Sequence, residues 1–271
     1  MVYVAQDSDF EKIDNCWVYK GQETEVEIPE YINGELVTST AFMFDTSKGA
    51  TSVTKVVLRH KNVTTMRGMF YKSNSSAPLL DLSNFDTSNV TDMSEMFYRC
   101  RKLTSLDVSS FNTSNVKDIG QMFADCTFLQ SLDVSGFDTS NVTSMYRMFF
   151  RCIHVQNLDL SNFIIKDNVN TDSIVDVEGA KLNVYIARKE DLPKLTKGLD
   201  ASKTPTFLIK KKYLDLEGLQ IYNEKVTGLI NGNKDEIEKL KANDGQGLAV
   251  EIVSRDKIDE TQNNSIIFVK R

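Results

Sequence analysis

Apolar and polar positions along the chain repeat with a period of 26 residues. The segment 80–90 reads Leu-Asp-Leu-Ser-Asn-Phe-Asp-Thr-Ser-Asn-Val and returns at 106–116 and 132–142, and a fourth copy begins at Leu158 and loses the pattern after Phe163. A fixed period in this range is typical of a solenoid, in which each copy forms one coil and stacked coils bury a shared core. Solenoids are more often binding or scaffolding modules than enzymes.

The spacing of apolar residues within one copy predicts two short elements. In the copy that starts at Leu106, the stretch 106–111 alternates apolar and polar residues, which suits a short strand with one face inward. The run 112–115, Asn-Thr-Ser-Asn, favours a turn because these side chains bond to nearby backbone. The stretch 116–123 carries apolar residues at steps of three and four, which fits a short helix. The expected fold is an α/β repeat, a leucine-rich-repeat-type solenoid of short parallel strands and short helical turns.

A Met-Phe pair extends the pattern beyond the full copies. The pair occurs at 43–44, 69–70, 96–97, 122–123 and 148–149, at intervals of 26, 27, 26 and 26 residues. We therefore expect about five coils, the first two divergent because a terminal coil faces solvent on one side and acts as a cap. The methionines, at helical spacing, are expected in the core rather than in a binding groove.

The repeated phrase resembles that of the BspA-like leucine-rich-repeat proteins. The resemblance rests on Leu-Asp-Val/Leu-Ser-x-Phe-Asp/Asn-Thr-Ser-Asn-Val followed by Met-x-x-Met-Phe-x-x-Cys, and the segment 19–34 also resembles that family. It covers residues 16–187, about two thirds of the chain. It implies a solenoid that is displayed on a cell surface or by a mobile element and is used in adhesion.

The chain after the repeat has a different pattern. Residues 181–186 are expected to form a last strand that caps a solenoid occupying residues 1–187. Residues 188–211 carry proline and glycine among charged residues and are predicted to be a linker. Residues 212–271 are predicted to form a small α+β segment that serves assembly or anchoring.

This C-terminal segment is expected to contain a helix or short coiled coil over 214–240, and a hairpin of the strands 248–253 and 266–269. It is too small for a large core of its own, so it is expected to pack on the solenoid, on its own copies or on another protein. The helix near Val226 favours a homo-oligomer. The phrase 212–219, Lys-Tyr-Leu-Asp-Leu-Glu-Gly-Leu, resembles a segment of bacteriophage tail and fibre proteins. That resemblance implies a virion protein.

Composition and charge narrow the classes of function. The 271 residues are 41% hydrophobic and 26% charged, and the net charge of −6 argues against a general affinity for nucleic acid or for a membrane surface. The longest apolar runs span only a few residues, so no transmembrane helix or membrane insertion is expected. Residues 1–7 do not read as a secretory signal peptide. Either the chain is used without export, or its leader has been removed.

The cysteines and histidines offer little for catalysis or metal binding. Cys100, Cys126 and Cys152 are 26 residues apart and are expected to be buried free thiols, whereas Cys16 stands apart. Metal binding needs convergent ligands, and neither of the two histidines, His60 and His154, has a spacing that matches the cysteines. The chain has no glycine loop of the Walker or dinucleotide-binding type. No catalytic residue, metal or cofactor is therefore predicted.

Several polar residues recur once in each copy. The aspartates of this kind are Asp81, Asp107, Asp133 and Asp159. A catalytic pair would be singular, so these carboxylates are expected to bond to turn backbone or to face solvent, with calcium binding as the alternative. The serine and asparagine rows of the Thr-Ser-Asn turns are expected to bond from one coil to the next.

Residues that differ between copies are the candidates for binding. Aromatic and basic residues gather just after the Met-Phe pair and within the preceding turn, and such residues are enriched at interaction centres. The predicted strip consists of Tyr71, Tyr98, Arg99, Arg101, Tyr146, Arg147, Phe150 and Arg151. The alternative is that these are ordinary exposed residues whose stems cover the core.

These patterns predict a non-enzymatic structural or adhesion protein. Our first hypothesis is a bacteriophage virion component, in a tail, fibre or capsid-decoration role, made in the host cytoplasm. The alternative is a bacterial cell-surface adhesin or a secreted interaction module. The expected partners are other virion or surface proteins, or a glycan or protein receptor on a cell, and multivalent copies would multiply weak contacts.

Overall fold

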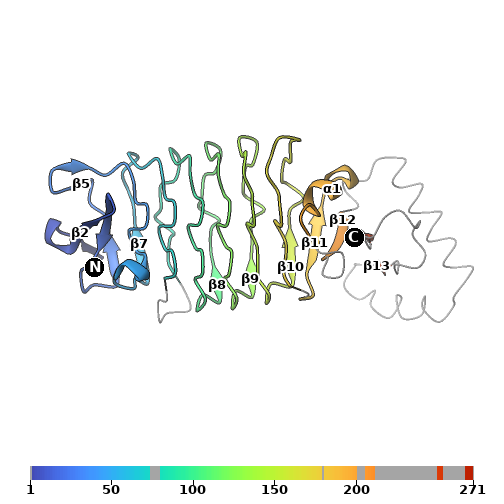
Figure 1. The fold of residues 1–271 in the computed structure, drawn as a ribbon, viewed down its shortest axis with the longest axis horizontal. Coiled ribbons are helices and arrows are strands. Elements are labelled where there is room, and N and C mark those ends of the chain that lie inside the picture. The colour runs from blue at the N-terminus through green and yellow to red at the C-terminus, as the bar shows by residue number, and fades with distance from the viewer. Residues whose placement is uncertain are drawn as a thin grey trace, which may run out of the picture.

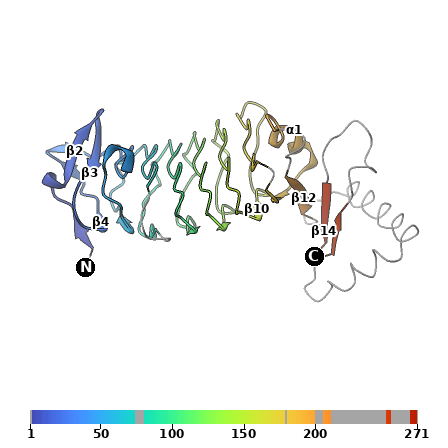
Figure 2. The same cartoon turned by 60° about the horizontal axis from the view of Figure 1, so that its bottom comes forward.

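The computed structural model describes residues 2–73, 80–178, 180–199, 205–210, 249–252 and 266–270. Its coils stack side by side along the long axis of the molecule, with the N-terminus at one end (Figure 1). A second view shows the same row of coils from another side (Figure 2). The prediction of a repeat solenoid is confirmed, because equivalent positions such as Ser105 and Ser131, 26 residues apart, pair in parallel.

Two rows of parallel pairing join successive coils. The strands of the first row are β4 (Glu25–Glu27), β7 (Lys55–Val57), β8 (Ser105–Leu106), β9 (Ser131–Leu132), β10 (Asn157–Asp159), β11 (Asn183–Ile186) and β12 (Thr206–Lys210). In this row β4 pairs with β7, β8 with β9, and β11 with both β10 and β12. The second row consists of single bridges that join Ser39, Thr65, Asp92, Asp118, Ser144 and Asn170 in turn. Coil-to-coil bonding thus satisfies backbone groups without long strands.

Short elements cover the N-terminal end. They are β1 (Tyr3–Val4), η1 (Asp7–Asp9), β2 (Phe10–Ile13), β3 (Cys16–Tyr19), β5 (Tyr31–Ile32), β6 (Glu35–Leu36) and η2 (Thr46–Lys48). β1 adds to β4 in parallel, while β2 pairs with β3 and β5 with β6 as hairpins. Phe10 and Tyr19 of the first hairpin are buried, and the Tyr19 ring packs 5.7 Å from that of Phe44. The hairpin therefore caps the core.

At the other end the parallel row continues beyond the strand that was expected to be the last. β12 pairs with β11, so β11 is not the edge of its sheet. The range expected as a linker contains η3 (Lys189–Asp191), α1 (Leu192–Leu195) and β12, and Leu192, Leu195 and Phe207 extend the buried core. β14 (Ile266–Lys270) adds to β12 in parallel, and β13 (Ala249–Ile252) pairs with β14 in antiparallel fashion. The helix predicted over 214–240 lies outside the described residues.

A column of phenylalanine rings runs through the core. Its members are Phe44, Phe70, Phe97, Phe123 and Phe149. Neighbouring rings are nearly parallel, with centroids 5.4 to 5.8 Å apart, and each ring is at most 1% exposed. All eight methionines after Met1 are also fully buried, as predicted. The Met-Phe pair is thus a core motif whose aromatic members stack because the coils are in register.

The short helix expected in each coil does not form in the described residues, and this prediction was wrong. The backbone N–H groups of the segment alternate between two kinds of partner. The N–H of Glu95 donates to the carbonyl of Gly120 in the next coil (2.9 Å), whereas that of Met96 donates to Met93 in its own coil (3.3 Å). Glu95 (φ 58°) and Gln121 (φ 55°) have left-handed backbone, which a right-handed helix does not allow. The three- and four-residue spacing reflects turns that place apolar side chains inward.

The asparagines of the turns bond from coil to coil, as expected, whereas the serine hydroxyls bond within their own coil, as that of Ser114 does to Asn112 (2.7 Å). The buried hydroxyl of Thr113 accepts a hydrogen bond from the N–H of Asp138 (2.8 Å) and donates to the Asp138 carbonyl (3.0 Å). The side-chain amide of Asn115 donates to the carbonyl of Ser88 in the preceding coil (2.7 Å). Repeated polar residues thus hold neighbouring coils together.

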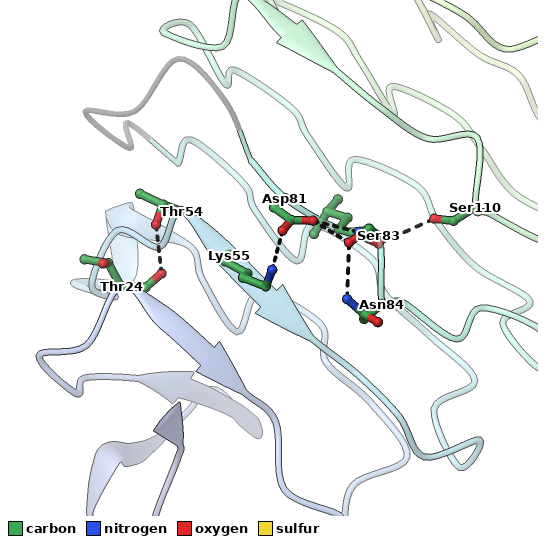
Figure 3. A network of polar contacts seen from close by, with 8 residues as sticks. Thr24, Thr54, Lys55, Asp81, Ser83, Asn84 and Ser110 are labelled. Carbon is green, nitrogen blue, oxygen red and sulfur yellow. Dashed lines mark hydrogen bonds and ion pairs between the residues drawn. The ribbon is translucent and has the colours of Figure 1, made fainter. Parts of the chain in front are cut away.

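The aspartates that recur once per copy bond to turn backbone, as predicted. Asp81 accepts from the N–H of Ser83 (3.0 Å) and from its hydroxyl (2.7 Å), while Lys55 of the preceding coil donates to the other carboxylate oxygen (2.5 Å; Figure 3). The hydrogen bond from Lys55, followed by those from Ser83, lowers the pKa of Asp81 to about 2. Asp107 and Asp133 likewise accept from the backbone N–H groups of Ser109 and Ser135 (both 2.9 Å).

Candidate functional site

The eight residues of the predicted strip occupy equivalent stretches of three coils. They are Tyr71, Tyr98, Arg99, Arg101, Tyr146, Arg147, Phe150 and Arg151; Arg101 is exposed and the others are half-buried. Between the last two of these coils lies one that carries Ala124 and Asp125 at the matching positions. That intervening coil divides the strip into two parts.

The first part is a short stack of aromatic rings. The rings of Tyr71 and Tyr98 are stacked with centroids 4.9 Å apart, and Phe42 contacts Tyr71 edge-on at 5.7 Å. Phe42 has left-handed backbone (φ 55°), and a Cβ at Gly68 would lie 2.4 Å from its ring, so glycine is required there. The small, fully buried Ala124 ends the stack, since it brings no ring between Tyr98 and Phe150.

The second part is centred on Arg147. Its guanidinium lies 5.1 Å from the ring centroid of Tyr146 and 4.8 Å from that of Phe150, which are cation–π contacts. The Nε of Arg147 is buried and has no hydrogen-bond acceptor among the described residues. Arg147 is thus held by rings rather than by a carboxylate.

Asp125, which is not among the eight predicted residues, joins the two parts. Its side chain is only 3% exposed, and Arg99 donates to Oδ2 from Nε (3.2 Å). The guanidinium groups of Arg101 and Arg151 approach Oδ1 at 3.7 and 3.6 Å, too far for hydrogen bonds. Three arginines that are 40 to 50% exposed thus surround one buried carboxylate. In the sequence, Asp125 is distinguished as an acidic residue at a position where the neighbouring copies carry Arg99 and Arg151.

Asp125 belongs to a column of charged residues with left-handed backbone. The column consists of Lys72, Arg99, Asp125, Arg151 and Glu178, with φ between 52° and 60°. From Arg99 onward the signs alternate, and the side chain of Arg151 reaches from Asp125 to Glu178 (3.1 Å). The backbone of the column also bonds to the following coil, since the N–H of Arg99 donates to Ala124 (2.8 Å). Stacking of the coils therefore fixes where these charges lie.

A groove adjoins the aromatic end of the strip. It has a volume of about 500 Å³ and is lined by Asp14, Cys16, Phe42, Asp45, Ser47, Lys48, Tyr71, Lys72 and Glu95. A second groove of about 470 Å³ lies over the polar turns near Asn84 and Asn112 and contains no residue of the strip. Acidic, basic and uncharged polar side chains line the first groove, so it can hold a polar group beside the Tyr71 ring.

The contacts of the repeated cysteines and of His154 indicate structural roles. The Sγ of Cys126 is fully buried and donates to the carbonyl of Phe97 (3.0 Å), and burial raises the pKa of this thiol to about 12. Cys100 and Cys152 make equivalent bonds, and all three are free thiols, as predicted. His154 is exposed and stacks on the ring of Phe128 at 5.6 Å. Within the described ranges, no group of three or more His, Cys, Asp or Glu side chains could hold a metal ion.

A comparison with known protein families gives a match to part of the chain. Residues 64–183 match the model of a family described as "Mycoplasma protein of unknown function, DUF285". Together with the solenoid, this similarity fits a BspA-like repeat protein. The searches of curated proteins and of solved structures each found no match, and no similarity to a bacteriophage protein was found. Where the structure describes the chain, no helix is long and apolar enough to cross a membrane.

Proposed function

We propose that the chain is a non-enzymatic interaction module that attaches through the strip and the arginines around Asp125. The observation that carries this proposal is the set of three half-exposed arginines held at one buried carboxylate, beside stacked aromatic rings. Arginine and aromatic side chains are the residues that most often dominate binding energy. Because the coils fix the backbone beneath them, little conformational entropy is lost when a partner binds.

The setting that we favour is the surface of a bacterial cell. The support is the resemblance of the repeat to BspA-like proteins and the match of residues 64–183 to a family described from Mycoplasma. A role in a bacteriophage particle rests on the short phrase 212–219, which lies outside the described residues. Mass spectrometry of purified particles and of surface-labelled cells separates the two settings, since the chain should be found in one fraction and not in the other.

We further propose that copies of the chain associate through residues 212–271 into a homo-oligomer, which would present several strips at once. Multivalent attachment can raise the overall affinity by factors of about 10² to 10⁴ over that of one copy. The solution mass of the chain with and without these residues tests this step. An unchanged number of chains per particle would remove the oligomer from the proposal and leave the strip untouched.

The attachment experiment measures binding of the labelled chain to intact animal cells and to intact bacterial cells by flow cytometry. The strip variant replaces Tyr98, Arg99, Phe150 and Arg151 by alanine and Asp125 by asparagine, so that no buried carboxylate loses its partners. We expect the wild-type chain to bind animal cells and the variant to lose at least tenfold in apparent affinity. Circular dichroism and thermal melting verify that the variant is folded.

A matched control carries Tyr31→Ala, Leu36→Ala and Lys117→Ala, all at exposed positions away from the strip. It removes exposed apolar surface and changes the net charge by the same amount as the strip variant, so its binding should be unchanged. Binding to bacterial cells alone would favour the phage setting. Absence of wild-type binding to either cell type, or equal losses in the control and the strip variant, would refute the proposed function.

A further inference from the structure

The charge of the strip contrasts with that of the whole chain. The chain has a net charge of −6, yet three of the four arginines of the strip share two carboxylate partners, Asp125 and Glu178, which lie outside the strip. The arginines of this group are Arg99, Arg101, Arg147 and Arg151. A local excess of positive charge on an acidic protein attracts an anionic partner to this place rather than to the molecule in general.

The arginines keep donors that no described residue of the protein accepts from. Arg99 bonds to Asp125 through Nε, and no acceptor among the described residues bonds to its Nη atoms. Arg151 directs Nε to Glu178 and is within ion-pair distance of Asp125 through Nη1, while Arg101 makes no hydrogen bond to Asp125. The planar fork of an arginine binds carboxylate and sulfate oxygens in pairs, which a lysine ammonium does not.

The backbone beneath the arginines excludes one common form of peptide binding. A peptide that adds as a strand needs free N–H and C=O groups at a sheet edge. Here the N–H of Arg99 donates to Ala124 and that of Arg151 donates to Asp176 in the following coil (both 2.8 Å). Recognition in the strip must therefore use side chains, namely guanidinium groups flanked by the rings of Tyr98, Tyr146 and Phe150.

From this geometry we infer that the strip binds an acidic polysaccharide, through sulfate or carboxylate groups that engage the arginines; the inference rests on the proposed function and names its ligand class. Arg99 and Arg151 are two coils apart, which is about 10 Å at the usual strand spacing. A polysaccharide of alternating sugars presents anionic groups at such regular intervals on a stiff chain, which loses less entropy on binding than a disordered acidic peptide. The edges and faces of the neighbouring rings can pack against the apolar side of the sugars.

The test measures binding of the full chain to immobilised heparin, hyaluronan, dextran and poly-L-glutamate by surface plasmon resonance at physiological salt. Heparin carries sulfates and hyaluronan carries only carboxylates, so these two arms identify the anionic group. We expect salt-dependent binding to at least one of them and none to neutral dextran. The variant Arg99→Gln, Arg101→Gln, Arg151→Gln, Asp125→Asn should bind at least tenfold more weakly.

Two further variants separate recognition from bulk charge. The control Lys61→Gln, Lys117→Gln makes the same change in net charge at exposed positions outside the strip and should leave binding unchanged. Arg99→Lys, Arg151→Lys keeps the charge and should still lose several-fold, because the paired hydrogen bonds are lost. Equal losses in the control, no binding to either acidic glycan, or tighter binding to poly-L-glutamate would overturn the inference. Loss of cell attachment in the strip variant without glycan binding would refute the ligand class while leaving the proposed function intact.

Discussion

Asp125 is almost inaccessible to solvent, and a single hydrogen bond, from Arg99, reaches its carboxylate among the described residues. A buried carboxylate loses its hydration, and only nearby positive charges and donors offset that loss. Arg101 and Arg151 supply charge but no hydrogen bond. The energetic role of this group should therefore depend strongly on which member is removed.

Removing positive partners from Asp125 should destabilise the fold more than removing the whole group. The change Arg99→Ala with Arg151→Ala leaves the buried carboxylate without a hydrogen bond and with only the charge of Arg101, 3.7 Å away, and should lower the free energy of unfolding by about 3 kcal/mol. Adding Asp125→Asn should recover most of that loss, because no buried charge remains. Urea denaturation of both variants measures the difference. A triple variant no more stable than the double variant would show that Asp125 is compensated in another way.

Asp81 predicts an acid-sensitive contribution to stability. Its pKa is lowered from 3.8 to about 2 in the folded chain, chiefly by the hydrogen bond from Lys55. A group with a lowered folded pKa stabilises above its unfolded pKa, and the contribution is lost as the pH falls from about 4 to about 2. The side chain is 42% exposed, so solvent screening limits the effect to under about 1 kcal/mol. Asp81→Asn should flatten the pH dependence of the melting temperature in that window, and an unchanged slope in this variant would contradict the prediction.

At the scale of one element, the turn around the methionine of the Met-Phe pair decides the course of each coil. The left-handed residue before that methionine is Phe42 in the first coil, Gly68 in the second, and Glu95, Gln121 and Arg147 in the next three. Residues other than glycine lose about 1 to 2 kcal/mol in this conformation, so bonding to the next coil has to compensate. The N–H of Gln121 provides such a bond, 2.7 Å from the carbonyl of Tyr146.

A β-branched residue at this position should be poorly tolerated. Gln121→Val should lower the free energy of unfolding by about 2 kcal/mol, because valine is a strong outlier at positive φ. Gln121→Asn should be close to neutral, since asparagine adopts this conformation readily. Thermal denaturation of the two variants tests the comparison. Equal stability would indicate that the turn changes its backbone conformation when the side chain changes.

At the scale of the whole molecule, each coil contacts chiefly its neighbours. The phenylalanine column passes through every coil from Phe44 to Phe149, and parallel bridges connect the same coils along a second line. Stability in such an array is approximately a sum of the coils and of the interfaces between neighbours. A defect in the middle should therefore weaken the adjacent interfaces more than distant ones.

Phe123→Ala should show this distance dependence. The lost ring leaves a cavity in the column and should lower the free energy of unfolding by about 3 to 5 kcal/mol. Hydrogen exchange should report the largest loss of protection at the amides of Phe97 and Met148, which lie in the adjoining coils, and the smallest at Val26 near the N-terminal end. A uniform loss of protection along the chain would mean that the solenoid unfolds as one cooperative unit.

The sequence by itself determined the solenoid, its period and its buried residues. Repetition every 26 residues places identical side chains above one another, so the Phe column, the Met rows and the Cys row follow from the pattern without knowledge of the turn. The path within a coil did not follow, because steps of three and four residues fit both a helix and a left-handed turn bonded to the next coil. Only the tertiary structure decided between them, since those bonds join residues about one period apart.

The same reason explains what the sequence revealed of the site. Differences between copies indicated the aromatic and basic residues, since a fixed backbone leaves variation at the surface. The role of Asp125 required the structure, because Arg99 and Arg151 reach it from opposite sides, one coil away in each direction. Contacts of that kind depend on how side chains lean across coils, which the order of residues in one copy does not determine.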